Sequence, residues 1–159
     1  MSGQIKPAPV RRSVLVAADP ARAFTLFTGR MGAWWPKTHS VGQGSPQVDV
    51  VVEPQAGGRW YERTADGGEC PWGHVIAWDP PGRLLLAWQV DGTWRFNPDL
   101  LTEVEVTFTL EGEGQTRVLL EHRHIERFGD LAAATRDSLD SAGGWQGILN
   151  LYAGLVAAG

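Results

Sequence analysis

Six stretches of strand-like sequence, separated by short turn signals, constrain the fold of this chain more than any other feature. The stretches are rich in valine, leucine, threonine and aromatic residues, and they span residues 47–54, 57–65, 72–79, 83–90, 101–110 and 115–126. Most of the connections combine glycine, proline and aspartate, which are typical of tight turns. Because short connections join neighbouring antiparallel strands, the sequence predicts an antiparallel meander.

The segment before this meander predicts one more strand and two helices. Residues 10–18 alternate well enough for a first strand, and Asp19 followed by Pro20 is a typical helix start. The apolar residues that follow repeat at helical spacing, with glycines among them. We therefore expect a helix, a kink and a second short helix that contains Trp34 and Trp35.

The segment after the meander changes to a helical period. Between residues 130 and 158, apolar side chains recur at steps of three and four, as on one face of an amphipathic helix. The adjacent Gly143 and Gly144 are a point at which this helix could break. One helix facing one antiparallel sheet makes an α+β domain with segregated layers. We expect a single domain over residues 1–159, with residues 1–9 as a loose N-terminal arm.

Several strings in this order of elements resemble one protein family. They are WWPKTHS at 34–40, EPQAGGRWYE at 53–62, WGHVIAWDPPGRLLLAW at 72–88, TEVEVTFTLEGEGQTRVLLEHR at 102–123 and GGW at 143–145. Over residues 10–157 the chain resembles the START-like (SRPBCC, helix-grip) superfamily, and within it the bacterial single-domain branch similar to the activator of the heat-shock chaperone ATPase. The resemblance implies a helix-grip fold, in which a curved antiparallel sheet wraps around a long C-terminal helix, with two short helices after the first strand.

The resemblance also implies a cavity between the sheet and the last helix. Relatives in the superfamily bind lipids, polyketides, hormones or other apolar molecules there, and some catalyse cyclisation or dehydration. The co-chaperone that gives the branch its name binds a heat-shock chaperone. We therefore expect the binding of an apolar or aromatic small molecule without a cofactor. Two alternatives stay open: a co-chaperone-like module whose partner is a heat-shock chaperone, and an enzyme of the cyclase or dehydratase kind.

Strand alternation assigns residues to the two faces of the sheet, and it places two polar residues inside. Glu62 and His122 share a face with apolar neighbours, and burying them unpaired would cost roughly 1–3 kcal/mol each. We expect them to be paired, hydrated or in contact with a ligand. They are also the candidate acid–base pair if the chain is an enzyme. Together with aromatic wall residues they form the predicted ligand-binding set: Trp60, Glu62, Trp88, Phe108, His122, Trp145 and Tyr152.

The same alternation predicts the rest of the inner and outer faces. Ala77 belongs with the inner set, whereas Trp72 and His74 belong outside or at the rim. A charged set on two neighbouring strands is expected to form cross-strand pairs on a solvated face: Glu103, Glu105, Arg117, Glu121 and Arg123.

The stretch LLEHRHIE at 119–126 places Glu121, His122 and His124 close together, as in a metal site. A histidine metal site needs about three converging ligands. Alternation turns Glu121 outward, and His124 shares the parity of His122 but lies at the strand's end, roughly 6.5–7 Å along the strand. We therefore expect no metal here.

Composition excludes several classes of function and leaves one question open. A net charge of −4 gives no basic patch for nucleic acid, and no apolar run is long enough to span a membrane. The single cysteine, Cys70, is compatible with a reducing cytoplasm, which is the expected location. Eight tryptophans indicate either a tryptophan-rich core or an aromatic-lined cavity. Trp34 and Trp35 are assigned to either the core or the cavity mouth.

Overall fold

The computed structural model describes residues 7–42 and 44–159, so residues 1–6 of the predicted arm lie outside it. In this described part, seven antiparallel strands form one sheet in the order β1-β7-β6-β5-β4-β3-β2. The strands are β1 Val10–Val16, β2 Gln47–Val52, β3 Arg59–Thr64, β4 Glu69–Asp79, β5 Arg83–Trp88, β6 Thr102–Leu110 and β7 Thr116–Arg123. Each strand from β2 to β6 pairs with the next along the chain, and β7 pairs with β1 on its other side. The predicted meander is confirmed.

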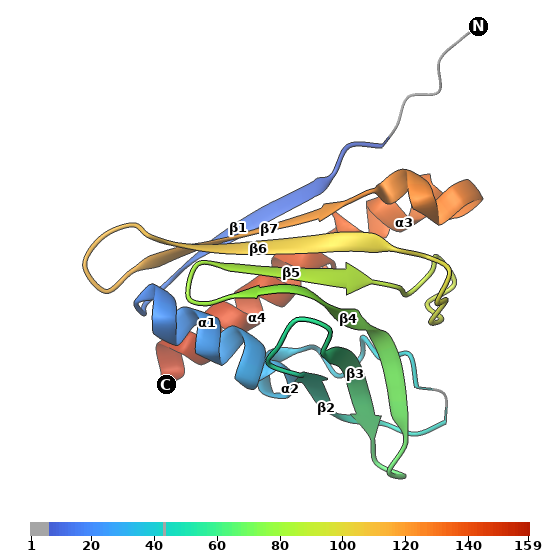
Figure 1. Ribbon diagram of the computed structural model, residues 1–159, viewed down its shortest axis with the longest axis horizontal. Helices are drawn as coiled ribbons and strands as arrows, with labels where there is room; N and C mark the ends of the chain where they lie inside the picture. Colours follow the sequence, from blue (N-terminus) through green and yellow to red (C-terminus); the bar gives the residue numbers. More distant parts are fainter. Residues whose placement is uncertain (1–6, 43) are drawn as a thin grey trace, which may run out of the picture.

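Helices pack against one face of this curved sheet, and Figure 1 shows α4 running across it beside α1 and α2. Asp19 caps α1 by accepting a hydrogen bond from the backbone N–H of Arg22 (2.8 Å), with Pro20 in the first turn. The helices are α1 Pro20–Gly29, α2 Met31–Trp34, the 3-10 helix η1 Ile125–Leu131, α3 Ala132–Leu139 and α4 Trp145–Ala158. None of them, over the described ranges, is long and apolar enough to cross a membrane.

The predicted break at Gly143 and Gly144 separates α3 from α4. A Cβ atom on Gly144 would lie 2.1 Å from the carbonyl oxygen of Leu139, so the chain can pass this close to α3 only without a side chain. Trp145 is therefore the first residue of α4, and its position is set by a glycine turn.

The core lies between the sheet and these helices, as the helix-grip resemblance implies. From α4 the core receives Trp145, Ile148, Leu149, Tyr152 and Val156. Ten of the strand residues predicted to face inward are buried: Trp60, Val75, Leu84, Leu86, Trp88, Val104, Val106, Phe108, Val118 and Leu120. Leu110, predicted to share the inner face of β6, is 59% exposed at the end of that strand.

A bulge in β4 overturns one assignment made from alternation. Tyr61 pairs with Pro71 and Trp60 pairs with Gly73, so Trp72 is an extra residue in β4. The bulge turns Trp72 into the core, where it is 2% exposed. The prediction that Trp72 lies outside or at the rim is wrong because the alternation restarts at this point.

A second bulge in β4 overturns another assignment made from alternation, that of Ala77. It places Ala77 opposite Leu85 and Trp78 opposite Leu84. Trp78 then reaches the core, where its ring centroid lies 4.9 Å from that of Phe24. The prediction that Ala77 belongs to the inner set is wrong for the same reason, a shift of register.

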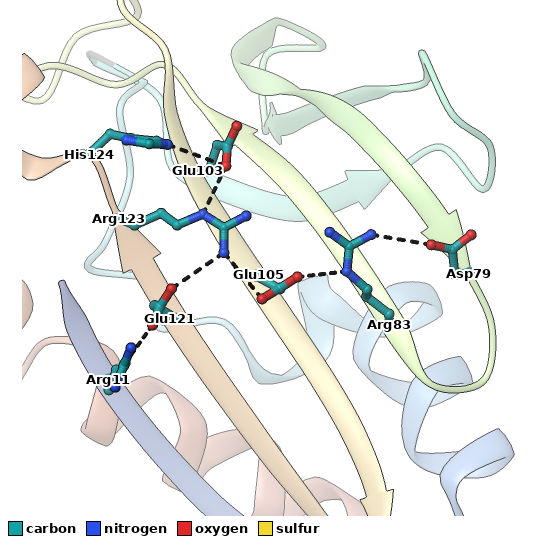
Figure 2. Close-up of polar contacts among 8 residues, drawn as sticks. All are labelled: Arg11, Asp79, Arg83, Glu103, Glu105, Glu121, Arg123 and His124. Atoms are coloured by element: carbon teal, nitrogen blue, oxygen red, sulfur yellow. Dashed lines mark hydrogen bonds and ion pairs between the residues drawn. The ribbon is translucent and has the colours of Figure 1, made fainter.

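The outer face of the sheet carries a connected set of ion pairs across β1, β7, β6, β5 and the end of β4 (Figure 2). At its centre Arg123 contacts Glu103 (2.8 Å), Glu105 (3.2 Å) and Glu121 (3.3 Å). Further pairs join Arg11 to Glu121, Arg83 to Glu105 and Arg83 to Asp79. The cross-strand pairs predicted for this face are confirmed at these positions.

One residue of the predicted charged set, Arg117, lies outside this network. Arg117 pairs with Glu111 (2.9 Å) near the β6–β7 turn, not with the central network. Within the network, the hydrogen bond from Arg83 holds the pKa of Glu105 below its ordinary value.

Candidate functional site

A pocket of about 380 Å³ opens beside the start of α4. It lies between α4, the end of α3, strands β4 and β5, and the loops that follow α2 and β5. This volume is within the range of small-molecule sites. The lining consists of Trp35, Thr38, His39, Ser40, Val41, Trp72, Trp88, Val90, Trp94, Ser138, Leu139, Gly143, Gly144, Trp145 and Ile148.

Four buried tryptophans of this lining form a closed ring of contacts, which we call the tryptophan quartet: Trp35, Trp72, Trp88 and Trp145. The ring centroids are 4.8 Å apart for Trp35 and Trp72, and 6.5 Å apart for Trp72 and Trp88. They are 5.5 Å apart for Trp88 and Trp145, and 5.8 Å apart for Trp145 and Trp35. Tilted and edge-to-face contacts at such distances are favourable, so the quartet is a preformed aromatic wall.

Every indole N–H of the quartet donates a hydrogen bond to the protein itself. The pairs are Trp35 to the His39 carbonyl (3.0 Å), Trp72 to the Glu62 carboxylate (2.9 Å), Trp88 to the Val90 carbonyl (2.9 Å) and Trp145 to Nδ1 of His122 (3.1 Å). The quartet thus offers carbon edges and π faces to the pocket, and its donors are already used.

Glu62 lies behind this wall and holds three residues of the pocket lining. Oε1 accepts hydrogen bonds from the Trp72 indole (2.9 Å) and from the backbone N–H of Val41 (2.7 Å), and Oε2 accepts one from the Ser40 hydroxyl. The carboxylate is fully buried, and these bonds offset the loss of its hydration. Trp72, Ser40 and Val41 line the pocket, but Glu62 does not.

His122 holds another part of the wall through a chain of hydrogen bonds. Trp145 donates to Nδ1, so the proton of the neutral ring lies on Nε2 and is donated to Oγ1 of Thr102 (2.8 Å). Thr102 donates in turn to the backbone carbonyl of Trp88 (2.9 Å). These hydrogen bonds connect Trp145 with Trp88, two members of the quartet, along the inner face of the sheet.

Burial keeps His122 uncharged, and the hydrogen bonds to Trp145 and Thr102 require the neutral ring. Desolvation lowers the pKa of His122 to about 3, so the ring is neutral at physiological pH. His124 behaves differently: it follows the end of β7 in the left-handed region (φ 68°), and its Nε2 lies 3.5 Å from Glu103 on the outer face. The two histidines therefore point to opposite sides of the sheet.

His39 is the one titratable side chain among the described residues that line the pocket. Its Nε2 lies 2.7 Å from the carbonyl oxygen of Gly143, so this nitrogen carries the proton and donates. Its Nδ1 lies 3.1 Å from the hydroxyl of Thr38. His39 thus ties the loop after α2 to the turn before α4, along one side of the pocket.

Two of the seven predicted site residues, Trp88 and Trp145, line the pocket. Trp60 packs one layer behind the quartet, with its ring centroid 5.4 Å from that of Trp72 and 5.7 Å from that of Trp88. Its indole N–H points to the sulfur of Met31 (3.3 Å).

Glu62 and His122 are both fully buried, as predicted. They are paired, but with other partners than each other, because β4, β5 and β6 lie between their strands in the sheet. Each supports one or two tryptophans of the wall from behind.

Phe108 and Tyr152 belong to an aromatic cluster around Phe27, with centroid distances of 5.7 Å and 5.1 Å. Trp34 connects this cluster to the quartet, with its ring centroid 5.3 Å from that of Tyr152 and 6.0 Å from that of Trp35. The hydroxyl of Tyr152 donates to the carbonyl of Ala23 (2.7 Å), and burial raises its pKa. Neither residue lines the pocket.

Sequence reasoning missed two lining tryptophans. The bulge reversed the face that alternation predicts for Trp72. Gly73 was a sign of this bulge in the sequence, since a glycine inside a strand often marks a bulge. A Cβ atom on Gly73 would lie 1.8 Å from the carbonyl oxygen of Ala87. Trp94 lies in a turn, where side-chain periodicity gives no direction.

Comparison with known proteins agrees with this architecture. The family model described as Activator of Hsp90 ATPase homolog 1-like protein matches residues 17–156. No protein of curated function matches the chain.

Solved structures with the helix-grip fold resemble it over nearly the whole length. An anthrahydroquino-Gama-pyrone synthase, Txn09, complexed with SUM, is 39% identical, with 94% of this chain and 97% of that chain covered and a TM-score of 0.66. The self-sacrificing resistance protein CalC from Micromonospora echinospora is 34% identical, with 95% of each chain covered and a TM-score of 0.70. A protein from Rhodobacter sphaeroides, 22% identical over 98% of each chain with a TM-score of 0.60, shares the fold.

Proposed function

The chain belongs to the family of Activator of Hsp90 ATPase homolog 1-like proteins, and from this premise we propose that it binds an uncharged aromatic small molecule in the pocket beside α4. The observation that carries this proposal is the tryptophan quartet, whose four indole N–H groups are all engaged by the protein. A wall of carbon edges and π faces favours a flat apolar ring system over a polar ligand.

The charge of the lining supports an uncharged ligand. Among the described lining residues there is no aspartate, glutamate, lysine or arginine. An ion placed in such a pocket would lose its hydration without gaining a charged partner. The polar side chains Thr38, His39 and Ser40 gather on the loop after α2, which suits hydroxyl or carbonyl oxygens along one edge of the ligand.

The name of one relative supports the same ligand class. The synthase that is 39% identical is named for an anthrahydroquino-pyrone, which is a fused ring system bearing oxygen. Carried over to this chain, that name favours fused aromatic molecules with oxygen substituents.

Titration with 1,8-dihydroxyanthraquinone tests the proposal. We expect saturable binding by calorimetry and a rise in melting temperature, because a ligand at 100 times its Kd adds about 2.7 kcal/mol of stability. Ser138→Trp should weaken binding by narrowing the pocket. Asp137→Trp is the matched control, since Asp137 is its exposed neighbour on α3 and does not line the pocket. Absence of saturable binding across a panel of apolar and aromatic compounds would refute the proposal.

A cyclase-like enzyme is the second candidate, because the same relative is named a synthase. Glu62 and His122 do not line the pocket, so this candidate assigns proton transfer to His39. It predicts turnover of a fused aromatic substrate with a pH profile that His39→Gln abolishes. Turnover with an unchanged profile in that variant would exclude His39.

The description of the family supports a co-chaperone role as another candidate. Such a role would need an exposed apolar patch that fits a protein partner, and within residues 7–42 and 44–159 no observation favours that use over small-molecule binding. A pull-down with the organism's own heat-shock chaperone separates the two functions.

A further inference from the structure

We infer that Trp94 closes the pocket over its ligand and selects planar ring systems, an inference that rests on the proposed small-molecule function. Trp94 lines the same pocket as the quartet, but it comes from the loop after β5 and stands at the mouth.

Exposure sets Trp94 apart from the quartet. Trp94 is 44% exposed, whereas each quartet member is at most 5% exposed. A large aromatic ring that is half in water gains free energy when a ligand covers it. A flat ligand lying against the quartet would provide that cover.

The backbone of Trp94 is strained, which its fold alone does not explain. Trp94 has φ 63°, in the left-handed region that bulky residues rarely adopt. It lies in the tight turn from Asp91 to Arg95, where glycine or asparagine is the usual residue in this conformation. Strain of this kind persists at binding sites, where the side chain has a use that outweighs its cost in stability.

Asp91 fixes the turn and therefore the direction of the ring. Its Oδ1 accepts hydrogen bonds from the Thr93 N–H (2.9 Å), the Thr93 hydroxyl (2.6 Å) and the Arg95 N–H (3.2 Å). The Trp94 N–H donates to the Asp91 carbonyl (2.9 Å). A turn held at this many points keeps Trp94 at the mouth before any ligand arrives, so little ordering is needed on binding.

The chemistry of this arrangement selects by shape. A planar aromatic molecule can touch the quartet on one side and Trp94 on the other with its π faces or edges. A saturated ring system of similar apolar character is puckered, so it brings fewer atoms into contact with the Trp94 ring than a flat one does. Planarity is therefore the property that Trp94 distinguishes.

The test compares two probes, 1,8-dihydroxyanthraquinone and testosterone, on four proteins: the wild type, Trp94→Phe, Trp94→Leu and Trp94→Gly. Trp94→Phe should keep most of the affinity for the anthraquinone, and the Leu and Gly variants should bind it about tenfold more weakly. Affinity for testosterone should change by less than about threefold. Trp94→Gly should also raise the melting temperature by about 2–4 °C, because glycine adopts this conformation without strain.

The outcomes separate this inference from the function on which it rests. If the wild type binds the anthraquinone and the Leu and Gly variants bind it equally well, the inference is wrong while the proposed function stands. A Trp94→Gly protein that melts below the wild type would show that the ring is a packing residue, and would overturn the inference. If the wild type binds neither probe, the proposed function fails and the inference fails with it.

Discussion

The indole N–H of Trp145 donates to Nδ1 of His122 across 3.1 Å, at the first residue of α4. The Nε2–H group of His122 donates a hydrogen bond to the Thr102 hydroxyl, which in turn donates one to the backbone carbonyl of Trp88. A buried polar residue in the sheet thus fixes the ring orientation of one pocket tryptophan and the backbone beside another. Under the proposed function, its role is to position the wall, and the ligand contacts the wall itself.

The two nitrogen atoms of His122 can be tested separately. Asparagine places an oxygen near the position of Nδ1, so His122→Asn should keep an acceptor for Trp145. Glutamine places its amide near Nε2, so His122→Gln should keep the bond to Thr102 and leave the Trp145 indole N–H without a buried acceptor, at about 1–3 kcal/mol. We expect the Gln variant to bind 1,8-dihydroxyanthraquinone more weakly than the Asn variant does.

The measurement is the anthraquinone affinity of both variants beside their free energies of unfolding in urea. Equal affinities in the two variants, at whatever stability, would show that the bond to Trp145 does not position the wall.

His122 also makes stability depend on pH. Its folded-state pKa is about 3, against an ordinary value of 6.5. Between these values the unfolded chain binds a proton that the folded chain does not, so the free energy of unfolding falls as the pH falls from 6.5 toward 3. The contribution approaches about 1.4 kcal/mol per pH unit. His122→Asn lacks this group, and its stability should fall less steeply in urea titrations from pH 7 to pH 4. Parallel curves would contradict the assignment.

Glu62 should matter as an acceptor rather than as a charge. Glu62→Gln keeps an oxygen for Trp72 and Val41, so we expect a loss of about 1 kcal/mol and retained anthraquinone binding. Glu62→Ala leaves buried donors unsatisfied, and it should cost about 3 kcal/mol or more and abolish binding. Glu113→Gln, at an exposed position, is the control and should stay within about 0.5 kcal/mol. A Gln variant as unstable as the Ala variant would contradict this account.

Two glycines near the pocket and in α4 should respond in opposite directions to alanine. At Gly144 a Cβ would lie 2.1 Å from the Leu139 carbonyl oxygen, so Gly144→Ala should shift the start of α4, lower stability by about 2 kcal/mol or more and weaken anthraquinone binding. At Gly154 nothing lies within 4 Å, so Gly154→Ala should raise stability by about 0.5–1 kcal/mol. Thermal unfolding measures both. A stabilised Gly144→Ala protein would refute the packing argument.

Local sequence patterns predicted most of the fold because each of them depends on residues close together in the sequence. The meander, the capped start of α1 and the break before α4 follow from alternation, from Asp19 with Pro20, and from Gly143 with Gly144. The outer ion pairs around Arg123 follow from alternation within uninterrupted strands.

The pocket was predicted less well because it lies where these periods end. Trp72 turns inward at a bulge, and Trp94 points from a turn, so alternation gave the wrong face for one and none for the other. Glu62 and His122 were rightly placed inside, but their partners depend on contacts between distant segments. Which layer a buried aromatic occupies, as for Trp60 and Phe108, depends on the curvature of the sheet.

The most direct test of the binding site is a nitrogen-15 spectrum of the eight tryptophan indole N–H groups, assigned by single substitutions and titrated with 1,8-dihydroxyanthraquinone. The signals of Trp35, Trp72, Trp88, Trp145 and Trp94 should shift and saturate together, because these rings line the pocket. The signal of Trp78 should stay in place, since its ring packs against Phe24 away from the pocket. An unchanged spectrum, or shifts confined to Trp78 and Trp34, would contradict ligand binding at the tryptophan quartet.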